Sequence, residues 1–349
     1  MKKDLFHNKN IFTILKLLFN KLRIRIYLYF FKIFYYLKLE KIPLLPISLD
    51  IEPTNRCNFR CPHCQLTYWN KKSCDLNLNA LKTILTQFPN INFVKLQGIG
   101  EPLLCKEFCE MLQYAESKLI NIDFTTNGSI ESKKFLEIVK KLNRTQIRFS
   151  IDGVNDHTLI KMRPEAKLNR ILEYASQILA ERGNKKQPKV IFWMVLTKYN
   201  INEIDELILL ANKLNIDCVG LQTTLHDWAK EEVKNITENI TVNYTADVFN
   251  DVIEKAKLLA DSLGIELLVE NSLLTKKNKC KWPFNSAFIA ANGDVVPCCW
   301  ISDSSVVKMG NIFEQSFDKI WNSEAYQDLR RSIKKHELKV FCKSCYNEK

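Results

Sequence analysis

Three cysteines near residue 60 constrain this 349-residue chain more than any other feature of its sequence. Cys57, Cys61 and Cys64 are spaced C-x3-C-x2-C in the segment "EPTNRCNFRCPHCQ". Four thiolates normally hold a [4Fe–4S] cluster. Because Cys74 lies in no ligating pattern, three local thiolates would leave one iron open to a substrate or cofactor. The spacing also permits a zinc knuckle, in which the Cys61–Cys64 pair is joined by His63 or Cys74.

The total of twelve cysteines bears on the compartment in which the chain works. No short apolar core followed by a small-residue cleavage site is evident near the N-terminus, so we expect no secretory signal peptide. In a reducing compartment, clustered cysteines bind metal or do redox chemistry more often than they form disulfides. We therefore expect a cytoplasmic protein whose cysteines are ligands or free thiols.

Most of the positive charge lies in residues 1–45. This segment holds ten Lys and Arg against two acidic residues, a net +8 of the total +12, and the other 304 residues carry only +4. Charges interrupt it too often for the roughly 20 consecutive apolar residues of a transmembrane helix. We predict a basic, aromatic, amphipathic helical arm that makes a peripheral contact with the inner membrane face. A helical arm packed on the protein or on a partner is the alternative, and nucleic-acid binding is not expected because charge alone does not specify it.

Apolar runs of strand length alternate with helix-like segments from residue 46 to about 224, which predicts parallel βαβ units. The expected strands are 47–52, 93–97, 120–125, 146–151, 190–196 and 217–222, and the expected helices are 77–88, 103–118, 130–142, 156–182 and 201–214. Six such units fit a partly closed α/β barrel or a doubly wound sheet. A polar, acidic stretch follows at 226–246, then a helix at 247–263 and a strand at 265–269, and the βαβ rhythm ends near 270.

Short polar motifs follow the expected strands, where functional residues lie in an α/β barrel. "GIGEP" follows the second strand, "TTNG" the third, "SIDG" the fourth and "LTKYNINEI" the fifth, and "KMRP" comes soon after "SIDG". Glycine lets the backbone approach a ligand closely, a carboxylate can accept from an ammonium, and an arginine can pair with a carboxylate. Taken singly, TTNG is equally compatible with a turn and SIDG with a helix cap. The candidate ligand-binding residues are Gly98, Gly100, Glu101, Thr126, Asn127, Ser150, Asp152, Arg163 and Leu196.

The cysteine loop after a first strand resembles that of the radical S-adenosylmethionine (SAM) superfamily, and Thr54, Asn55 and Asn58 suit the opening of its motif. The resemblance covers about 46–224 and implies a partial (β/α)6 TIM-like barrel. It implies that Cys57, Cys61 and Cys64 bind the [4Fe–4S] cluster that cleaves SAM, and that the 5′-deoxyadenosyl radical takes a substrate hydrogen. GIGEP resembles the segment that holds the SAM amino group, SIDG one that contacts its ribose or carboxylate, and Leu196 begins one that resembles an adenine-side segment.

A second group of cysteines occupies the C-terminal part of the chain. "IAANGDVVPC" predicts a hairpin through its Asn-Gly turn, which would bring Cys280 and Cys298 together. With "GNIFEQSFDKIWNS" and the late pair Cys342 and Cys345, this region resembles the SPASM/twitch extension of radical SAM enzymes. The resemblance implies one auxiliary [4Fe–4S] cluster on these four cysteines, with Cys299 as a spare thiol or a buried apolar residue. A four-cysteine zinc site is the alternative.

The expected domains are the arm 1–45, the radical SAM core 46–245, a connecting helix and strand 246–275, and the SPASM/twitch-like domain 276–349. Cys105, Cys109 and Cys218 fit no ligating pattern and are expected to be core or surface thiols.

Because the resemblance includes dehydrogenases and residues 1–45 are too short for a peptide-recognition domain, we expect an oxidoreductase acting on a small molecule, sugar or membrane-linked glycan. Candidate bases are His226, Asp227 and Tyr199. A peptide- or protein-modifying maturase is the alternative, and a non-catalytic iron–sulfur electron-transfer or zinc-binding interaction protein is an alternative of another class. A flavodoxin- or ferredoxin-type protein is the expected electron donor.

Overall fold

The computed structural model describes residues 22–27, 29–33, 35, 37, 39–70, 72–242, 246–270 and 280–346. The first half of the predicted arm therefore lies outside the described residues.

One sheet of ten strands organises the chain, in the order β10-β9-β8-β1-β2-β3-β4-β5-β6-β7. Strands β1 to β7 pair in parallel with their sequence neighbours, which confirms the predicted α/β barrel-like core. Their bounds are Ser48–Ile51, Phe93–Leu96, Asn121–Thr126, Thr145–Ser150, Lys189–Val195, Cys218–Gln222 and Glu266–Glu270. The six predicted core strands are thus present, and β7 extends the parallel sheet by one strand.

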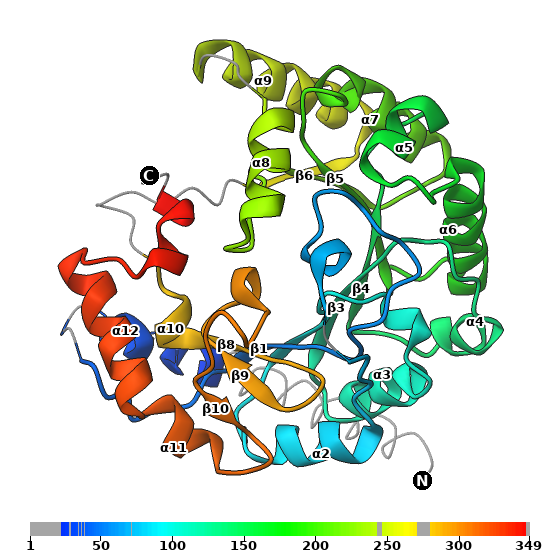
Figure 1. Ribbon diagram of the computed structural model, residues 1–349. Helices are drawn as coiled ribbons and strands as arrows, with labels where there is room; N and C mark the ends of the chain where they lie inside the picture. The colour runs from blue at the N-terminus through cyan, green and yellow to red at the C-terminus, as the bar shows by residue number, and fades with distance from the viewer. Residues whose placement is uncertain are drawn as a thin grey trace, which may run out of the picture.

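Helices cover the outer side of this curved sheet (Figure 1). The helices of the barrel are α2 Leu78–Thr86, α3 Phe108–Ser117, α4 Lys133–Val139, α5 Asp156–Met162, α6 Leu168–Arg182, α7 Ile204–Lys213, α8 Glu231–Ile240 and α9 Ala246–Leu263. Their apolar faces form one core with the strands, as Phe108 of α3 and Phe135 of α4 do by packing edge-on against Phe124 of β3. The short 3-10 helices at the strand ends are η1 Gln65–Tyr68, η2 Pro102–Leu104 and η3 Ile201–Glu203.

One helix prediction was wrong, and one helix was not predicted. The single helix predicted over 156–182 is broken into α5 and α6, because Pro164 disfavours the helical conformation at Arg163, which has φ −139° and ψ 81°. The polar stretch 226–246 contains helix α8, which buries Val233, Thr237 and Ile240 on one face. Its spacing of i, i+4, i+7 is helical, but the surrounding charged and Asn residues obscure it in the sequence.

The C-terminal region continues the barrel sheet. Strand β8 Ser286–Ile289 pairs in parallel with β1, and then β9 Asp294–Val296 and β10 Gly310–Asn311 follow in antiparallel order. The predicted hairpin is therefore present, with Gly293 in the left-handed region of its turn at φ 85°. The remaining helices are α10 Trp282–Asn285, η4 Cys299–Ile301, α11 Phe317–Trp321, α12 Glu324–Lys335, η5 Val340–Cys342 and η6 Ser344–Tyr346.

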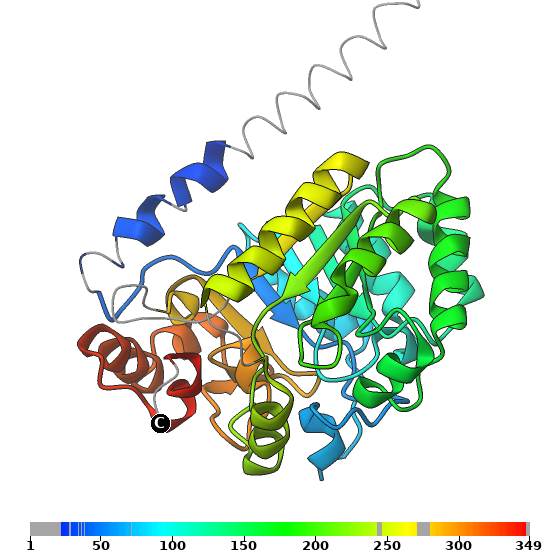
Figure 2. The ribbon, with the colours of Figure 1, turned by 90° about the horizontal axis from the view of Figure 1, so that it is seen from above.

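An N-terminal helix lies beside this body, with helical residues at 22–27, 29–33 and 35 (Figure 2). One face packs inward: Phe31 is buried, the Tyr35 ring meets Phe284 edge-on at 5.1 Å, and the Asn90 side chain donates to the Tyr27 hydroxyl. On this face the helix packs against the protein, as the alternative of a packed helical arm predicted. No helix in the described part of the chain combines the length and apolarity needed to cross a bilayer.

Candidate active site

A cavity of about 290 Å³ lies where the parallel strands end. It receives the loop after β1, the turn after β2, the ends of β3, β4 and β5, and the segment after β9. The predicted site residues that line it are Cys57, Cys61, Cys64, Gly98, Gly100, Glu101, Thr126, Asn127, Ser150 and Arg163. Asp152 and Leu196 are buried beside it without lining it, and Val195 lines it in place of Leu196.

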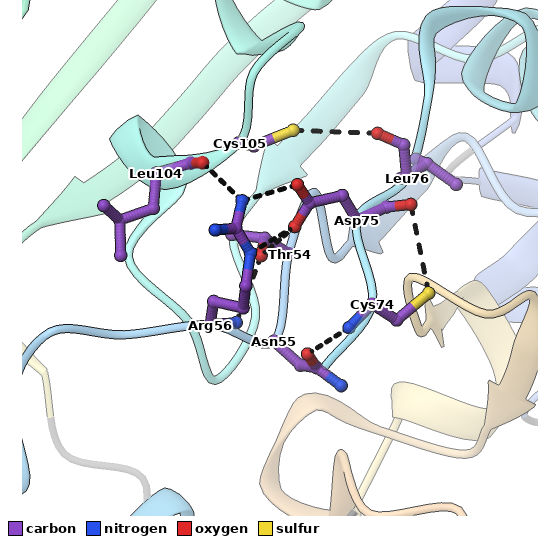
Figure 3. Close-up of polar contacts among 8 residues, drawn as sticks. All are labelled: Thr54, Asn55, Arg56, Cys74, Asp75, Leu76, Leu104 and Cys105. Carbon is purple, nitrogen blue, oxygen red and sulfur yellow. Dashed lines mark hydrogen bonds and ion pairs between the residues drawn. The ribbon is translucent and has the colours of Figure 1, made fainter. Parts of the chain in front are cut away.

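A bracket of polar contacts holds the cysteine loop in place (Figure 3). Arg56 donates to both carboxylate oxygens of Asp75, at 2.9 and 2.5 Å, and to the Leu104 carbonyl at 2.7 Å. Thr54 donates to the same carboxylate at 2.6 Å, and the Asn55 side chain accepts from the Cys74 amide at 2.7 Å. The loop is thereby tied to two other segments before its cysteines begin. Cys74 belongs to this bracket and does not line the cavity.

The three loop thiols are buried or half-buried in the cavity wall. The Cys64 backbone amide donates to the Cys61 carbonyl at 3.0 Å in a turn that positions these two cysteines, and the side-chain amide of Asn127 donates to Cys57 Sγ at 3.8 Å. Burial raises the pKa of all three, to about 12 for Cys61, and the positive charge of Arg163 opposes the rise. Metal binding requires thiolates, so Arg163 favours the ligating form.

The turn after β2 brings backbone and a carboxylate to the cavity. A Cβ on Gly100 would lie 2.3 Å from the Thr54 carbonyl and 2.5 Å from that of Arg56, so only glycine fits. Next to it, the buried Glu101 carboxylate accepts from the Thr126 hydroxyl and the Asn127 backbone amide, both at 2.7 Å. Burial raises the pKa of Glu101 to about 7, despite these donors. A cationic ligand beside it would stabilise its charged form.

Arg163 reaches the cavity because Pro164 ends α5 at this point. Asp152 receives the Arg163 Nε–H at 2.7 Å on one oxygen and the Val195 amide at 2.8 Å on the other. The neighbouring Asp152 carboxylate and the loop cysteines raise the pKa of Arg163 against the opposing effect of burial. Asp152 therefore positions the guanidinium, and the guanidinium faces the cavity.

Charged side chains inside the barrel were missed by the sequence analysis. Asp50, Lys95 and Asp123 are register neighbours on β1, β2 and β3, and Arg148 of β4 pairs with Asp123 at 2.6 Å. Arg148 also lies 4.2 Å from the centre of the Trp193 ring. The sequence did carry a signal for them, because each of these apolar strands contains a charged residue. Since side chains alternate between the two faces of a strand, that residue can point into the barrel while its neighbours point outward.

Asp50 and Lys95 line the cavity below the cysteine loop. Asp50 is 6% exposed, and burial raises its pKa to about 6, against the opposing effects of Lys95 and of a hydrogen bond with Cys299. The Lys95 side chain makes no hydrogen bond or ion pair with the residues that the structure describes. Beside them, Gln97 Oε1 is buried without a described partner. The cavity floor therefore offers a carboxylate, an ammonium and an amide oxygen to a ligand.

Of the three candidate bases, only His226 lines the cavity. Its ring lies against that of Trp300, and burial lowers its pKa to about 3, so it is neutral at physiological pH. Asp227 accepts from the Ala229 amide at 2.9 Å, and Tyr199 lies near Lys161 and Lys198 outside the cavity. Asp50, which was not predicted, is the carboxylate in the better position.

The structure brings the four predicted auxiliary cysteines together from three segments. Cys280, Cys298, Cys342 and Cys345 are half-buried, and the charges of neighbouring cysteines help to raise the pKa of Cys298, Cys342 and Cys345. Burial is the main cause, and it raises the pKa to about 11 for Cys280 and about 12 for Cys298. The Cys280 amide donates to the Tyr346 hydroxyl at 2.8 Å, which ties the first ligand segment to the last.

Cys299 lies apart from these four. Cys298 has an extended backbone, φ −161° and ψ 165°, so the side chains of Cys298 and Cys299 point to opposite sides. Cys299 lines the main cavity beside Asp50, whereas Cys298 faces the other C-terminal cysteines. The spare thiol therefore belongs to the cavity wall.

The remaining cysteines lie away from the cavity, whose own side chains suit a cluster better than a single metal ion. Cys105, Cys109 and Cys218 are buried in the core. Among the described residues, no three His, Cys, Asp or Glu side chains converge on a single metal ion. Thiolates around a [4Fe–4S] cubane each bind a different iron, so they need not converge on one point. Three thiols in one wall, with a carboxylate and a guanidinium nearby, fit such a cluster with an amino-acid ligand.

Comparisons with known proteins agree with this geometry. The radical SAM superfamily model matches residues 51–211, and the iron–sulfur cluster-binding SPASM domain model matches residues 280–346. The chain is 26% identical over 321 residues to the tungsten-containing aldehyde ferredoxin oxidoreductase cofactor-modifying protein of Pyrococcus furiosus, covering 85% of this chain and 86% of that protein. It is 22% identical over 319 residues to mycofactocin maturase MftC of Mycolicibacterium smegmatis, covering 86% and 75%.

Among solved structures, SuiB of Streptococcus suis bound to S-adenosylmethionine shares the fold. The TM-score is 0.67 at 20% identity, covering 82% of this chain and 68% of SuiB. Both family resemblances read from the cysteine motifs are confirmed by these matches.

Proposed function

This chain is a radical SAM enzyme with a C-terminal SPASM domain that uses SAM and [4Fe–4S] clusters, and from that premise we propose that it modifies a peptide. Relatives named as a mycofactocin maturase and as the PqqA peptide cyclase of Xanthomonas euvesicatoria, the latter 22% identical over 311 residues, support this proposal. SuiB, which shares the fold, has been solved bound to a precursor peptide. These relatives favour the maturase alternative over the small molecule, sugar or membrane-linked glycan first expected.

The structural support for this proposal is a cavity that both regions of the chain line. The loop of Cys57 comes from the radical SAM region, whereas Cys299 and Trp300 come from the SPASM region, and all three line one cavity. A substrate bound there would contact both regions at once. It would also meet the polar floor of Asp50, Lys95 and Gln97, which suits the amide and charged groups of a peptide.

Cys57, Cys61 and Cys64 would hold the SAM-cleaving cluster. Glu101 would accept from the SAM ammonium and Arg163 would pair with its carboxylate, since both line the same cavity. When bound, the cluster and SAM supply a 5′-deoxyadenosyl radical that removes a hydrogen atom from the substrate. Gly100 allows the backbone to approach the ligand, and Asp152 keeps Arg163 directed at it.

Oxidation of a substrate carbon after hydrogen removal also releases a proton and an electron. The Asp50 carboxylate would take the proton, because its raised pKa of about 6 lets it accept and then release a proton near neutral pH. His226 also lines the cavity, but burial lowers its pKa to about 3, which makes it a weaker proton acceptor than Asp50. The electron would pass to one auxiliary cluster held by Cys280, Cys298, Cys342 and Cys345. Cys298 of this set is adjacent in the chain to Cys299, which lines the cavity.

A flavodoxin- or ferredoxin-type protein would supply the electron for SAM cleavage. The compartment would be a reducing cytoplasm, which suits twelve cysteines of which none is drawn into a disulfide.

The test uses protein reconstituted without oxygen and supplied with dithionite and SAM. Short peptides encoded beside the gene are added, and 5′-deoxyadenosine and the peptide mass are followed. We expect one peptide to raise 5′-deoxyadenosine formation and to lose mass as hydrogen or a small fragment. The Cys57→Ala variant should abolish both signals. Stimulation only by sugars or small alcohols, with every peptide inert, would contradict the peptide proposal.

A further inference from the structure

The N-terminal helix presents a second face that the barrel does not cover. Leu22, Ile26, Tyr29 and Leu37 are 56%, 45%, 64% and 65% exposed. Their spacing of i, i+4, i+7 places the first three along one side of a helix, opposite the inward-facing Tyr27 and Phe31. The protein therefore leaves an apolar stripe in water on a helix whose other face is already packed.

Basic side chains accompany this stripe. Arg23, Arg25 and Lys32 are exposed, and at 100° per residue Arg25 and Lys32 fall on one edge of the stripe and Arg23 near the other. Residues 22–37 contain no Asp or Glu, and residues 1–21, outside the described part, add five Lys against one Asp in the sequence. Apolar residues enter the acyl boundary while flanking Lys and Arg reach anionic headgroups, which is the pattern of an interfacial helix.

The inner contacts of this helix show which end of the barrel it covers. Tyr27 meets Asn90, which precedes β2, and Tyr35 meets Phe284, which precedes β8. Both contacts lie where parallel strands begin, whereas the cavity lies where they end. Strands of four to seven residues separate the two ends by about 13–23 Å. Figure 2 shows the same separation, with the N-terminal helix and the η1 loop on opposite sides of the sheet.

We propose that the outer face of the N-terminal helix docks on an anionic membrane surface, with the active-site cavity at the end of the barrel turned away from the bilayer. A lipid-embedded glycan would then meet the wrong end of the barrel, whereas a water-soluble substrate would reach the cavity freely. The docking does not depend on the proposed peptide chemistry, because binding is measured without turnover.

The first test is co-sedimentation of the full chain with phosphatidylcholine vesicles, with and without phosphatidylglycerol. We expect binding only to the anionic vesicles, and release as salt is raised. The variant Arg23→Glu/Arg25→Glu/Lys32→Glu should weaken binding by at least roughly 100-fold, since each basic residue near the surface contributes about fivefold and charge reversal adds repulsion. The exposed triple Lys133→Glu/Lys140→Glu/Lys141→Glu on and after α4 makes the same change in net charge and should bind as the parent does.

A second variant keeps the test decisive if charge reversal harms folding. Ile26→Gln/Tyr29→Gln leaves every charge and the inner face in place, and it should also lose binding. Hydrogen exchange should show vesicle-dependent protection at 22–37 and none at the cysteine loop 52–64. Protection at the loop would overturn the orientation. Absence of binding to anionic vesicles, or equal weakening by the α4 triple, would overturn the docking and leave a protein partner as the reading of this face.

Discussion

Replacing Asp50 by Asn should make the protein more stable while removing its proposed proton acceptor. Burial raises the pKa of this carboxyl from 3.8 to about 6, and Lys95 offsets burial only in part. A raised carboxyl pKa means that its stabilising contribution is present below 3.8 and is lost as the pH rises through about 6. The difference between 3.8 and about 6 corresponds to a loss of about 3 kcal/mol in the free energy of unfolding above that pH range. The amide of Asn carries no charge and can still accept from Cys299.

Urea unfolding of the cluster-free protein, under reducing conditions and without oxygen, measures this effect. We expect Asp50→Asn to gain about 3 kcal/mol in the free energy of unfolding at about pH 7.5 and only about 0.5 kcal/mol at about pH 4. Asp261→Asn, on the exposed side of α9, should change it by less than about 0.5 kcal/mol at either pH. A destabilised Asp50→Asn at pH 7.5 would refute the reasoning, because it would mean that Lys95 compensates the buried charge in full.

Three further predictions follow from the site. Glu101→Gln should weaken SAM binding by roughly 10- to 100-fold in calorimetry, through loss of a charge-assisted hydrogen bond. In the parent, whose Glu101 has a pKa of about 7, SAM affinity should fall by up to about tenfold from about pH 8 to about pH 6 as the carboxylate is protonated. A SAM affinity that does not change with pH would exclude this carboxylate as the partner of the ammonium. Gly100→Ala should destabilise the protein by roughly 1–3 kcal/mol and abolish SAM binding, because its Cβ would meet the Thr54 carbonyl at 2.3 Å; unchanged binding would mean that the turn relaxes freely. Cys298→Ser should lower iron from about eight to about four per chain, whereas Cys299→Ser should keep about eight, and equal losses would make both thiols ligands.

The sequence was sufficient for the features that depend on local pattern. Apolar runs of strand length predicted β1 to β6 within one or two residues, because a strand buried on both faces needs continuous apolar residues. The cysteine spacing predicted the loop and the family, and the Asn-Gly turn predicted the β8–β9 hairpin. It failed on the continuity of the helix expected over 156–182, which Pro164 divides at Arg163, although Arg163 itself had been predicted as a ligand-binding residue.

The sequence by itself determined the groups that are close together along the chain: three thiols in one loop, a turn with two glycines, and a pair of late cysteines. Only the tertiary structure decided which side chains face each other. It assigns Cys298 and Cys299, adjacent in the chain, to different sites, and it gathers Asp50, Lys95 and Cys299 from three segments into one cavity floor. The physical reason is that successive residues of an extended chain point in opposite directions, and that long-range pairing of strands sets which of them meet.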